Sequence, residues 1–278
     1  MSDTGSYKLP AAKQDAQTEI ERLAAQARSG WDKEARMMSW FGLKDGMSVL
    51  ELGSGPGFIT HQLAALVPNS PITCVEIDRT LLDQAEQYLQ GKSTQPITFM
   101  EGSVMETNLE SEQFDFAYAR FLFQHLPDPA GAAKETWRLL KPGGKLLISD
   151  IDDELFGLFE PPLPEFEPVL KAFGRMQATK GGNRHIGRKL SDLLTAAGFA
   201  APELEVIGSH SANRDLDSFL RHLAPDRMRS LVKNGFLSNE DLEQFRVAIT
   251  AWAANPDAYT IWLSLMVCAE KPAEDGRQ

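Results

Sequence analysis

The chain has 278 residues, of which 42% are hydrophobic and 24% are charged, as in an ordinary globular protein. With 28 Lys and Arg against 39 Asp and Glu, its formal net charge is −11, so we expect no nucleic-acid partner. The polar N-terminus lacks the apolar core of a signal peptide, and no apolar run reaches about 18 residues, which predicts a protein that is neither exported nor membrane-spanning. Cys74 and Cys268 lie in apolar runs and predict buried, reduced thiols in a cytoplasmic protein.

The first half of the chain alternates strand and helix patterns. Apolar spacing over 11–42 predicts two short helices, and a buried strand at 48–52 then leads through a glycine-rich loop into a helix at 58–67. Strands are expected at 72–77, 97–100, 114–119 and 145–149, with helices at 81–89 and 129–140. Asp128 is the expected N-cap of the latter helix, and 141–144 a turn after it. This alternation predicts an α/β fold with a doubly wound, parallel sheet.

The second half departs from that alternation. Residues 151–186 are acidic, aromatic and proline-rich, and they are too long for an ordinary connection, so we expect a helical lid insertion. A helix at 190–197, a strand at 204–209, a helical stretch at 215–252 and a last strand at 259–269 follow. We expect one domain, made of an N-terminal helical cap at 1–45, a cofactor-binding core at 46–150, the lid at 151–186 and a C-terminal part at 187–278.

The loop after the first strand has the spacing of a ligand-binding turn. Gly53, Gly55 and Gly57 form G-x-G-x-G, which lets backbone approach a ligand at the carboxyl edge of a parallel sheet. Glu76 ends the second strand, where a carboxylate can accept both hydroxyls of a ribose. Together they indicate an adenosine-type ligand. Dinucleotide enzymes share both features, and a solvated acid at a strand end is the alternative for Glu76.

Five segments resemble, in order and spacing, the motifs of class I (Rossmann-like) S-adenosylmethionine-dependent methyltransferases: VLELGSGPG, CVEID, FMEGSV, FDFAYARFLFQHLPDP and LLKPGGKLLISD. They cover about residues 46–150, and the last strands resemble that family's reversed terminal hairpin. The resemblance implies a mainly parallel seven-stranded sheet with an antiparallel last strand. It also implies S-adenosyl-L-methionine as cofactor and methyl transfer to an O, N or C atom of a small molecule. A dehydrogenase would be expected to show G-x-G-x-x-G and no K-P-G-G turn.

The resemblance also implies which residues contact the cofactor. The positions that match are Tyr7, Arg22, Glu51, Gly53, Ser54, Gly55, Gly57, Glu76, Ile77, Gly102, Ser103, Val104, Arg120 and Phe121. The glycine loop would face the methionine part, with Glu51 near its ammonium group, Glu76 on the ribose and Ile77 on the adenine face. Many relatives have an acid where this chain has Ser103, which leaves that adenine contact open.

Two of these positions, Phe121 and Arg22, have structural alternatives. Arg120 and Phe121 follow the fourth strand, near the expected sulfonium, where a ring adds cation–π attraction, and core packing is the alternative for Phe121. Tyr7 and Arg22 are similar to a leading Tyr and Arg that close over the cofactor in quinone and natural-product methyltransferases. A solvated helix face is the alternative for Arg22.

Methyl transfer is an in-line displacement that depends mainly on alignment in a dry cleft, so a base is needed only for a nucleophile of high pKa. The candidate bases are His125, Asp150 and His185, with structural roles as the alternatives for His125 and Asp150. We expect the lid to order over the substrate on a Gly181-Gly182 hinge, with Arg184 holding an anionic or carbonyl group. None of the five histidines has metal-ligand spacing, so no metal is expected.

Five side chains of the insertion either line an apolar acceptor pocket or pack the insertion onto the sheet: Phe156, Phe159, Phe166, Phe173 and Met176. A lining role favours an aromatic, polyketide, terpenoid or modified-peptide acceptor from secondary metabolism or a quinone-like pathway. The alternatives to methyl transfer are a natural-product cyclase that keeps S-adenosylmethionine, or a noncatalytic binding subunit. The acceptor and the oligomeric state, with a homodimer as one option, are left open.

Overall fold

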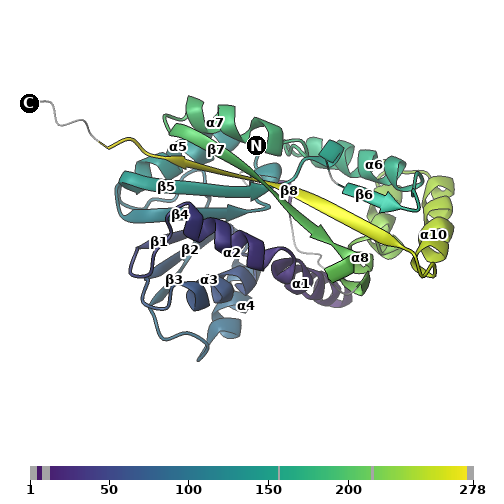
Figure 1. The fold of residues 1–278 in the computed structure, drawn as a ribbon, viewed down its shortest axis with the longest axis horizontal. Helices are drawn as coiled ribbons and strands as arrows, with labels where there is room; N and C mark the ends of the chain where they lie inside the picture. The colour runs from purple at the N-terminus through teal and green to yellow at the C-terminus, as the bar shows by residue number, and fades with distance from the viewer. Residues whose placement is uncertain (1–4, 8–12, 156, 214–215, 274–278) are drawn as a thin grey trace, which may run out of the picture.

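The computed structural model describes residues 5–7, 13–155, 157–213 and 216–273, and a twisted sheet runs through its centre (Figure 1). The strands follow the order β3-β2-β1-β4-β5-β8-β6, with β7 pairing the other edge of β8. Their bounds are β1 (Val49–Leu52), β2 (Ile72–Glu76), β3 (Ile97–Glu101), β4 (Phe114–Arg120), β5 (Leu140–Asp150), β6 (Gly157–Glu160), β7 (Ala200–His210) and β8 (Tyr259–Glu270).

The first five strands are parallel, and β8 is antiparallel to β5, β6 and β7. The doubly wound, mainly parallel sheet with an antiparallel last strand is therefore confirmed. The insertion adds an eighth strand, the short β6, to the seven that were expected. Because β8 is long, it pairs β5 through one half and β6 through the other.

Helices cover both faces of the sheet, with α2, α3 and α4 on one face and α5 and α7 on the other (Figure 1). The two layers bury separate apolar clusters, one around Met38 and Leu63 and one around Ala133 and Leu194. The bounds are α1 (Lys13–Arg28), α2 (Trp31–Trp40), α3 (Phe58–Leu66), α4 (Arg79–Leu89), α5 (Pro129–Leu139), α6 (Phe166–Ala178), α7 (Leu190–Ala196), α8 (Leu216–His222), α9 (Arg229–Lys233) and α10 (Asn239–Ala253). As predicted, the Asp128 side chain caps α5 by accepting from the Gly131 N–H.

The turn expected at 141–144 lies within β5 instead of before it. The partner in β5 shifts from Leu140, opposite Phe114, to Lys145, opposite Phe116, so the residues between them bulge out of the ladder. Gly143 has φ +80°, a left-handed conformation that suits glycine. The K-P-G-G sequence therefore forms a bulge within β5, and parallel pairing with β4 continues on both sides of it.

The helical stretch expected at 215–252 is divided into several pieces. Pro225 begins a 3₁₀ helix, η5 (Pro225–Met228), and Gly235, with φ +75°, follows α9 before the Ser238 cap of α10. These pieces pack with α6 into a third apolar cluster, at the end of the molecule opposite α3 and α4 (Figure 1). The insertion and the segment before β8 thus form one helical layer.

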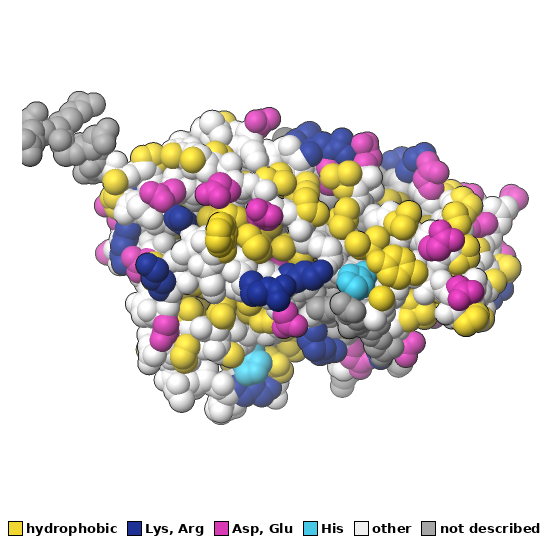
Figure 2. All heavy atoms as spheres, viewed as in Figure 1, with side chains coloured by type: hydrophobic (Ala, Val, Ile, Leu, Met, Phe, Trp, Pro, Cys, Tyr) yellow, Lys and Arg dark blue, Asp and Glu magenta, His cyan; other side chains and the backbone are white. Residues whose placement is uncertain are grey.

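The aromatic side chains proposed as a pocket lining belong to that cluster. Phe166 is buried in it, and Phe159, Phe173 and Met176 are partly buried against it. In the structure, these four side chains therefore pack against other apolar groups instead of standing free. Phe156 lies outside the described residues. On the face seen in Figure 2, hydrophobic side chains also gather over β7 and β8, where Leu204 and Val206 are exposed.

Cys74 and Cys268 are buried free thiols, as predicted. Within the described ranges, no helix combines the length and the hydropathy required to cross a bilayer.

A buried ion pair joins the N-terminal helices to the end of β4. Arg120 donates to both carboxylate oxygens of Glu34 on α2, at 2.8 and 3.0 Å, and Tyr118 donates to the same carboxylate at 2.6 Å. The guanidinium also donates to the carbonyls of Gln26 and Ser29 at the end of α1. Because backbone carbonyls at a helix end lack intrahelical donors, this one side chain fixes two helices at once.

We expect Arg120→Met to lower the free energy of unfolding by about 3 to 5 kcal/mol, because it leaves the Glu34 carboxylate buried without its cation. Urea denaturation measures this loss. The control Arg246→Met removes the exposed ion pair with Glu243 on α10 and should leave the stability nearly unchanged. Equal losses in the two variants would contradict an anchoring role for Arg120.

Candidate active site

The glycine loop forms an open cradle between β1 and α3. Gly53, Gly55 and Gly57 all have positive φ, at +68°, +54° and +77°. A Cβ on Gly53 would lie 2.8 Å from Leu122, and one on Gly57 would lie 2.9 Å from Ala85, whereas one on Gly55 would meet nothing within 4 Å. Two glycines therefore allow close packing, and the middle one faces open space.

Ser54 adds an unused polar group to this cradle. Its Oγ is buried and has no hydrogen-bond partner among the described residues. A buried hydroxyl without a partner costs free energy, so a ligand that bonds to it would remove this penalty.

The Glu76 carboxylate is held at the end of β2 by three backbone amides. The N–H of Gly55 donates to Oε2 at 2.9 Å, and the N–H groups of Ile77 and Asp78 donate to Oε1 at 2.9 and 3.0 Å. Burial nevertheless raises the pKa of Glu76 above its ordinary value, with the three amides opposing the shift. Next to this acid, the side chain of Ile77 is 38% exposed, which makes it a flat apolar platform beside a hydrogen-bond acceptor.

Glu51 lies beneath the loop rather than in it. Its side chain is buried, and burial raises its pKa to about 7. One of its oxygens lies 3.7 Å from the thiol sulfur of Cys74, which also lies 3.7 Å from the hydroxyl of Thr60. A nearby cation would return this carboxyl toward its charged form.

The third motif contributes mainly backbone. Gly102 has open space around it, and its N–H donates to the carbonyl of Glu76 at 3.0 Å. Ser103 accepts a bond from the N–H of Met105, and the side chain of Val104 is buried in the core. Of the three, Gly102 therefore leaves the most room for a ligand.

The two residues expected near the sulfonium, Arg120 and Phe121, follow each other at the end of β4. The Arg120 guanidinium is committed to Glu34 and to the end of α1, so its side chain is not available to a ligand. Phe121 has φ +52°, an uncommon conformation for an aromatic residue, and its N–H donates to the carbonyl of Ser149. Strain of this kind gathers at functional sites because the surrounding structure must hold it in place.

Tyr7 and Arg22 converge on a residue that the sequence did not single out, Glu19. Arg22 donates to both oxygens of Glu19, at 2.8 and 2.6 Å, and the Tyr7 hydroxyl donates to one of them at 3.1 Å. Burial, followed by the Glu19 charge, raises the pKa of Tyr7 well above its usual value, and the charge of Glu76 contributes too. The solvated alternative for Arg22 is wrong, since its side chain is 9% exposed.

Of the three base candidates, two are enclosed. Asp150 is fully buried and accepts from the N–H groups of Gln124 and Ile151, and burial raises its pKa to about 7. His125 contacts the N-terminal segment, with Nδ1 2.8 Å from the Ser6 hydroxyl. Burial, with the charges of Arg184 and Arg22, lowers the pKa of His125 to about 3. Both residues therefore brace the turn after β4.

His185 is the accessible candidate. Its side chain is 44% exposed, and its Nδ1 lies 3.4 Å from Oδ1 of Asp152. Asp152 in turn accepts from Arg188 and is itself buried. An acid beside a half-exposed imidazole orients the ring.

The segment proposed as a hinge is tightly packed. A Cβ on Gly182 would lie 2.7 Å from the carbonyl oxygen of Gln124, and the N–H of Asn183 donates to that same oxygen. Arg184 pairs with Asp153 at 2.5 and 2.8 Å, so its charge is neutralised within the protein. The expected use of Arg184 for an anionic group of the substrate is therefore not supported.

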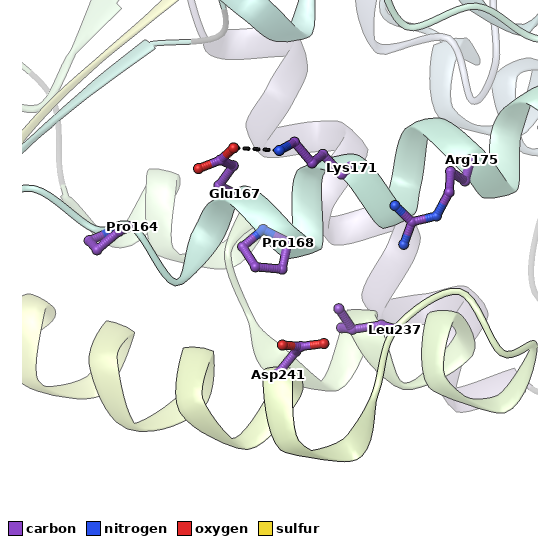
Figure 3. A pocket seen from close by; sticks show the side chains of 7 residues that line it. All are labelled: Pro164, Glu167, Pro168, Lys171, Arg175, Leu237 and Asp241. Atoms are coloured by element: carbon purple, nitrogen blue, oxygen red, sulfur yellow. Dashed lines mark hydrogen bonds and ion pairs between the residues drawn. The ribbon is translucent and has the colours of Figure 1, made fainter.

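A surface groove of about 380 Å³ between α6 and α10 lies apart from all these residues (Figure 3). Its charged groups have partners: Lys171 pairs with Glu167, Arg175 donates to the Phe236 carbonyl, and Asp241 accepts from Ser238. It offers little to recognise a cofactor, so we do not include it in the candidate site. Among the described residues, no group of His, Cys, Asp and Glu is arranged to hold a metal ion.

We expect His125 to make the stability of this site pH-dependent. The pKa of His125 is about 3 in the folded state and 6.5 in the reference state, so the unfolded chain gains a proton first as the pH falls. When the pH falls from about 7.5 to 5, the free energy of unfolding of wild type should decrease by about 2 kcal/mol more than that of His125→Gln. The glutamine side chain does not titrate in this range. Urea denaturation at both pH values tests this. An unchanged difference would mean that His125 is solvated with an ordinary pKa.

Comparison with known proteins agrees with this geometry. Residues 50–148 match the family model described as a methyltransferase domain. An uncharacterized 37.1 kDa protein in a transposon of Streptomyces fradiae is 30% identical over 62% of this chain and 49% of its own length. The demethylmenaquinone methyltransferase of Lactococcus lactis is 24% identical over 65% of this chain and 78% of its own length. The chain thus spans about half of the length of the first of these relatives.

Two solved structures share the fold. A proposed methyltransferase from Bacillus halodurans superposes with a TM-score of 0.60 at 20% identity, over 86% of this chain and 98% of its own. A phosphoethanolamine N-methyltransferase of Haemonchus contortus, solved with phosphomonomethylethanolamine and S-adenosylhomocysteine, gives 0.56 at 18% identity, over 87% and 53%. At these identities the likeness concerns the fold alone. The sequence match covers residues 50–148, which hold the glycine loop and most of the five parallel strands, and the structural likeness shows a shared fold over most of the chain.

Proposed function

We propose that this protein transfers the methyl group of S-adenosylmethionine to an O, N or C atom of a small molecule. The observation that carries the proposal is the Gly55 amide bonded to the Glu76 carboxylate, which joins an open glycine cradle to an acceptor for ribose hydroxyls. The buried thiols also support a reducing, cytoplasmic setting for the enzyme.

The residues present fit that cofactor on grounds of their own chemistry. The cradle at Gly55 would receive the methionine part, with the unpartnered Ser54 hydroxyl as a donor or acceptor and the Glu51 carboxyl beneath it for an ammonium group. Glu76 would accept the ribose hydroxyls while its amide bonds hold it in place. The exposed Ile77 side chain would cover one face of the adenine.

The remaining proposed cofactor contacts come from backbone groups and from one aromatic ring. Gly102 and Ser103 would approach the adenine edge with backbone, and Val104 would support them from the core. Phe121 would place a ring near the sulfonium, while Arg120 would act only through the backbone of β4. Tyr7 and Arg22 would close the site as a unit through Glu19.

When bound, S-adenosylmethionine supplies a methyl group on a sulfonium that is already a strong electrophile. The chain would then align the acceptor and exclude water. His185 is the side chain best placed to remove a proton from the acceptor, because Asp152 orients it and it is half-exposed. His125 and Asp150 would position the turn after β4 and would not touch the acceptor.

S-adenosylhomocysteine should bind the wild-type protein, and NAD should not. Glu76→Ala should weaken that binding by about 1.5 to 3 kcal/mol, the value of hydrogen bonds to a charged acceptor. The control is Glu101→Ala, which removes the exposed acid paired with Glu76 in register on β3 and should bind like wild type. Isothermal titration calorimetry measures the affinity of each protein for S-adenosylhomocysteine and for NAD. Binding of NAD without S-adenosylhomocysteine, or no effect of Glu76→Ala, would contradict the proposal.

His185→Ala should lower acceptor-dependent formation of S-adenosylhomocysteine by about 100-fold or more, as for loss of a general base. Cofactor affinity should stay within about twofold of wild type, because the proposed role is toward the acceptor alone. Turnover is measured with phenols and amines as acceptors, and titration of S-adenosylhomocysteine supplies the affinity. Undiminished turnover would leave orientation alone to explain the rate, and product formed without S-adenosylhomocysteine would favour the cyclase alternative.

A further inference from the structure

Glu51 is a buried carboxyl group with no positive charge beside it. The residue is 3% exposed, and its Oε2 lies 3.7 Å from the thiol sulfur of Cys74. Within the described part of the chain, Glu51 belongs to no ion pair. A thiol is a weak hydrogen-bond donor, so it compensates little of a buried negative charge. A carboxyl group in such surroundings avoids the cost of burying its charge by keeping a proton.

The groups beside Glu51 on the neighbouring elements are neutral. In the sheet, Glu51 lies in register between Cys74 on β2 and Tyr118 on β4. Burial raises the pKa of both neighbours, so the thiol and the phenol are uncharged at neutral pH. On α3, the fully buried Thr60 has its hydroxyl 3.7 Å from the Cys74 sulfur. None of these three side chains supplies a cation.

The nearest charged groups do not supply one either. The Tyr118 hydroxyl donates to Glu34, and Arg120 already neutralises that carboxylate. The carboxylate of Glu76, at the end of β2, is negative. Burial raises the pKa of Glu51 to about 7, and the charge of Glu76 adds to the shift, while bonds from neutral donors oppose it. A proton on Glu51 therefore agrees with its surroundings on every side.

The same acid lies below the open glycine cradle. The N–H groups of Gly53 and Ser54 both donate to the Val75 carbonyl, at 2.8 and 3.4 Å, which fixes the loop against the end of β2. The Ser54 Oγ is buried without a partner among the described residues, and a Cβ on Gly55 would meet nothing within 4 Å. Residues 51–55 thus combine a buried acid without a cation, an unused hydroxyl and room for a ligand.

We propose that Glu51 carries a proton in the free protein around and below neutral pH, and releases it to solvent when the ammonium group of the cofactor binds; this inference rests on the proposed methyltransferase function. The O–H bond of the carboxyl group breaks, the proton passes to the buffer, and the ammonium group becomes the compensating charge. Because the protonated acid cannot pair with that group, the affinity for the cofactor weakens as the pH falls.

The test compares S-adenosylhomocysteine, which carries the ammonium group, with 5′-methylthioadenosine, which has the same nucleoside and lacks the amino-acid part. Calorimetry at pH 6 in phosphate and in imidazole, which differ in ionisation enthalpy, counts the protons released. Since the pKa of Glu51 is about 7, S-adenosylhomocysteine should release about 0.9 proton, and its affinity should fall about eightfold from pH 7.5 to pH 6. 5′-Methylthioadenosine should release about 0.2 proton or less, because Glu76 and the base contacts serve both ligands.

Glu51→Gln should bind S-adenosylhomocysteine without releasing a proton, and its affinity should change by about twofold or less between these pH values. The matched control is Asp150→Asn, which replaces a second buried acid with a pKa of about 7, bonded to the amides of Gln124 and Ile151. This control should keep the proton release, because Asp150 lies at the end of β5 and outside the glycine loop.

The inference is overturned if S-adenosylhomocysteine binds wild type without releasing a proton, if 5′-methylthioadenosine releases as many, or if the release survives in Glu51→Gln. The comparison of the two ligands uses wild type alone, so it decides even if a variant does not fold. Failure of wild type to bind either ligand would contradict the proposed function. Binding without proton release would overturn only the role of Glu51.

Discussion

The pairing of Arg120 with Glu34 is the interaction on which the arrangement of the site depends. A parallel sheet places its loops at one edge without assistance, but the N-terminal helices lie outside the sheet and need an anchor. Arg120 supplies it from the end of β4, bonding at once to Glu34 on α2 and to two carbonyls at the end of α1. The position of α1 then decides where Glu19 and Arg22 lie, and through Glu19 where the Tyr7 hydroxyl binds.

Three carboxylates, those of Glu34, Glu19 and Glu76, differ in the groups that stabilise their charge, and this difference indicates their roles. Glu34 and Glu19 are neutralised by arginine forks and serve structure. Glu76 is held only by backbone amides, which are neutral dipoles, and burial still raises its pKa. An acid held in this way keeps acceptor capacity for a ligand, and two hydroxyl donors from a ribose would stabilise its charged form.

The turn after β4 shows how buried groups can serve a site without touching a ligand. Asp150 accepts from the Gln124 amide at this turn and from the amide of its own neighbour Ile151, and His125 lies against Ser6 and Tyr7. The Gln124 carbonyl accepts from Gln177 and from the N–H of Asn183, which fastens the insertion to the same turn. The N-terminal segment, the insertion and β5 are thus tied to one short stretch, whose first residue, Phe121, holds a strained backbone.

The sequence by itself determined the alternation of strands and helices that builds the mainly parallel sheet, and the glycine loop. Alternating apolar runs, glycine spacing and the acid at the end of β2 are local signals, because each depends on neighbours along the chain. The same local signals placed Asp128 as a helix cap and left 141–144 as a simple turn, although there pairing with β4 extends past the glycines.

What only the tertiary structure decided was which charged groups pair with one another. Arg120, Arg184 and Arg227 are three arginines whose partners the sequence does not indicate. The first is buried against Glu34, the second pairs with Asp153, and the third has no ion-pair partner among the described residues. Partners that lie 31 to 86 positions apart leave no pattern along a chain. Burial and ion pairing depend on which distant segments meet, so the fold alone decides which of these cations has an anion beside it.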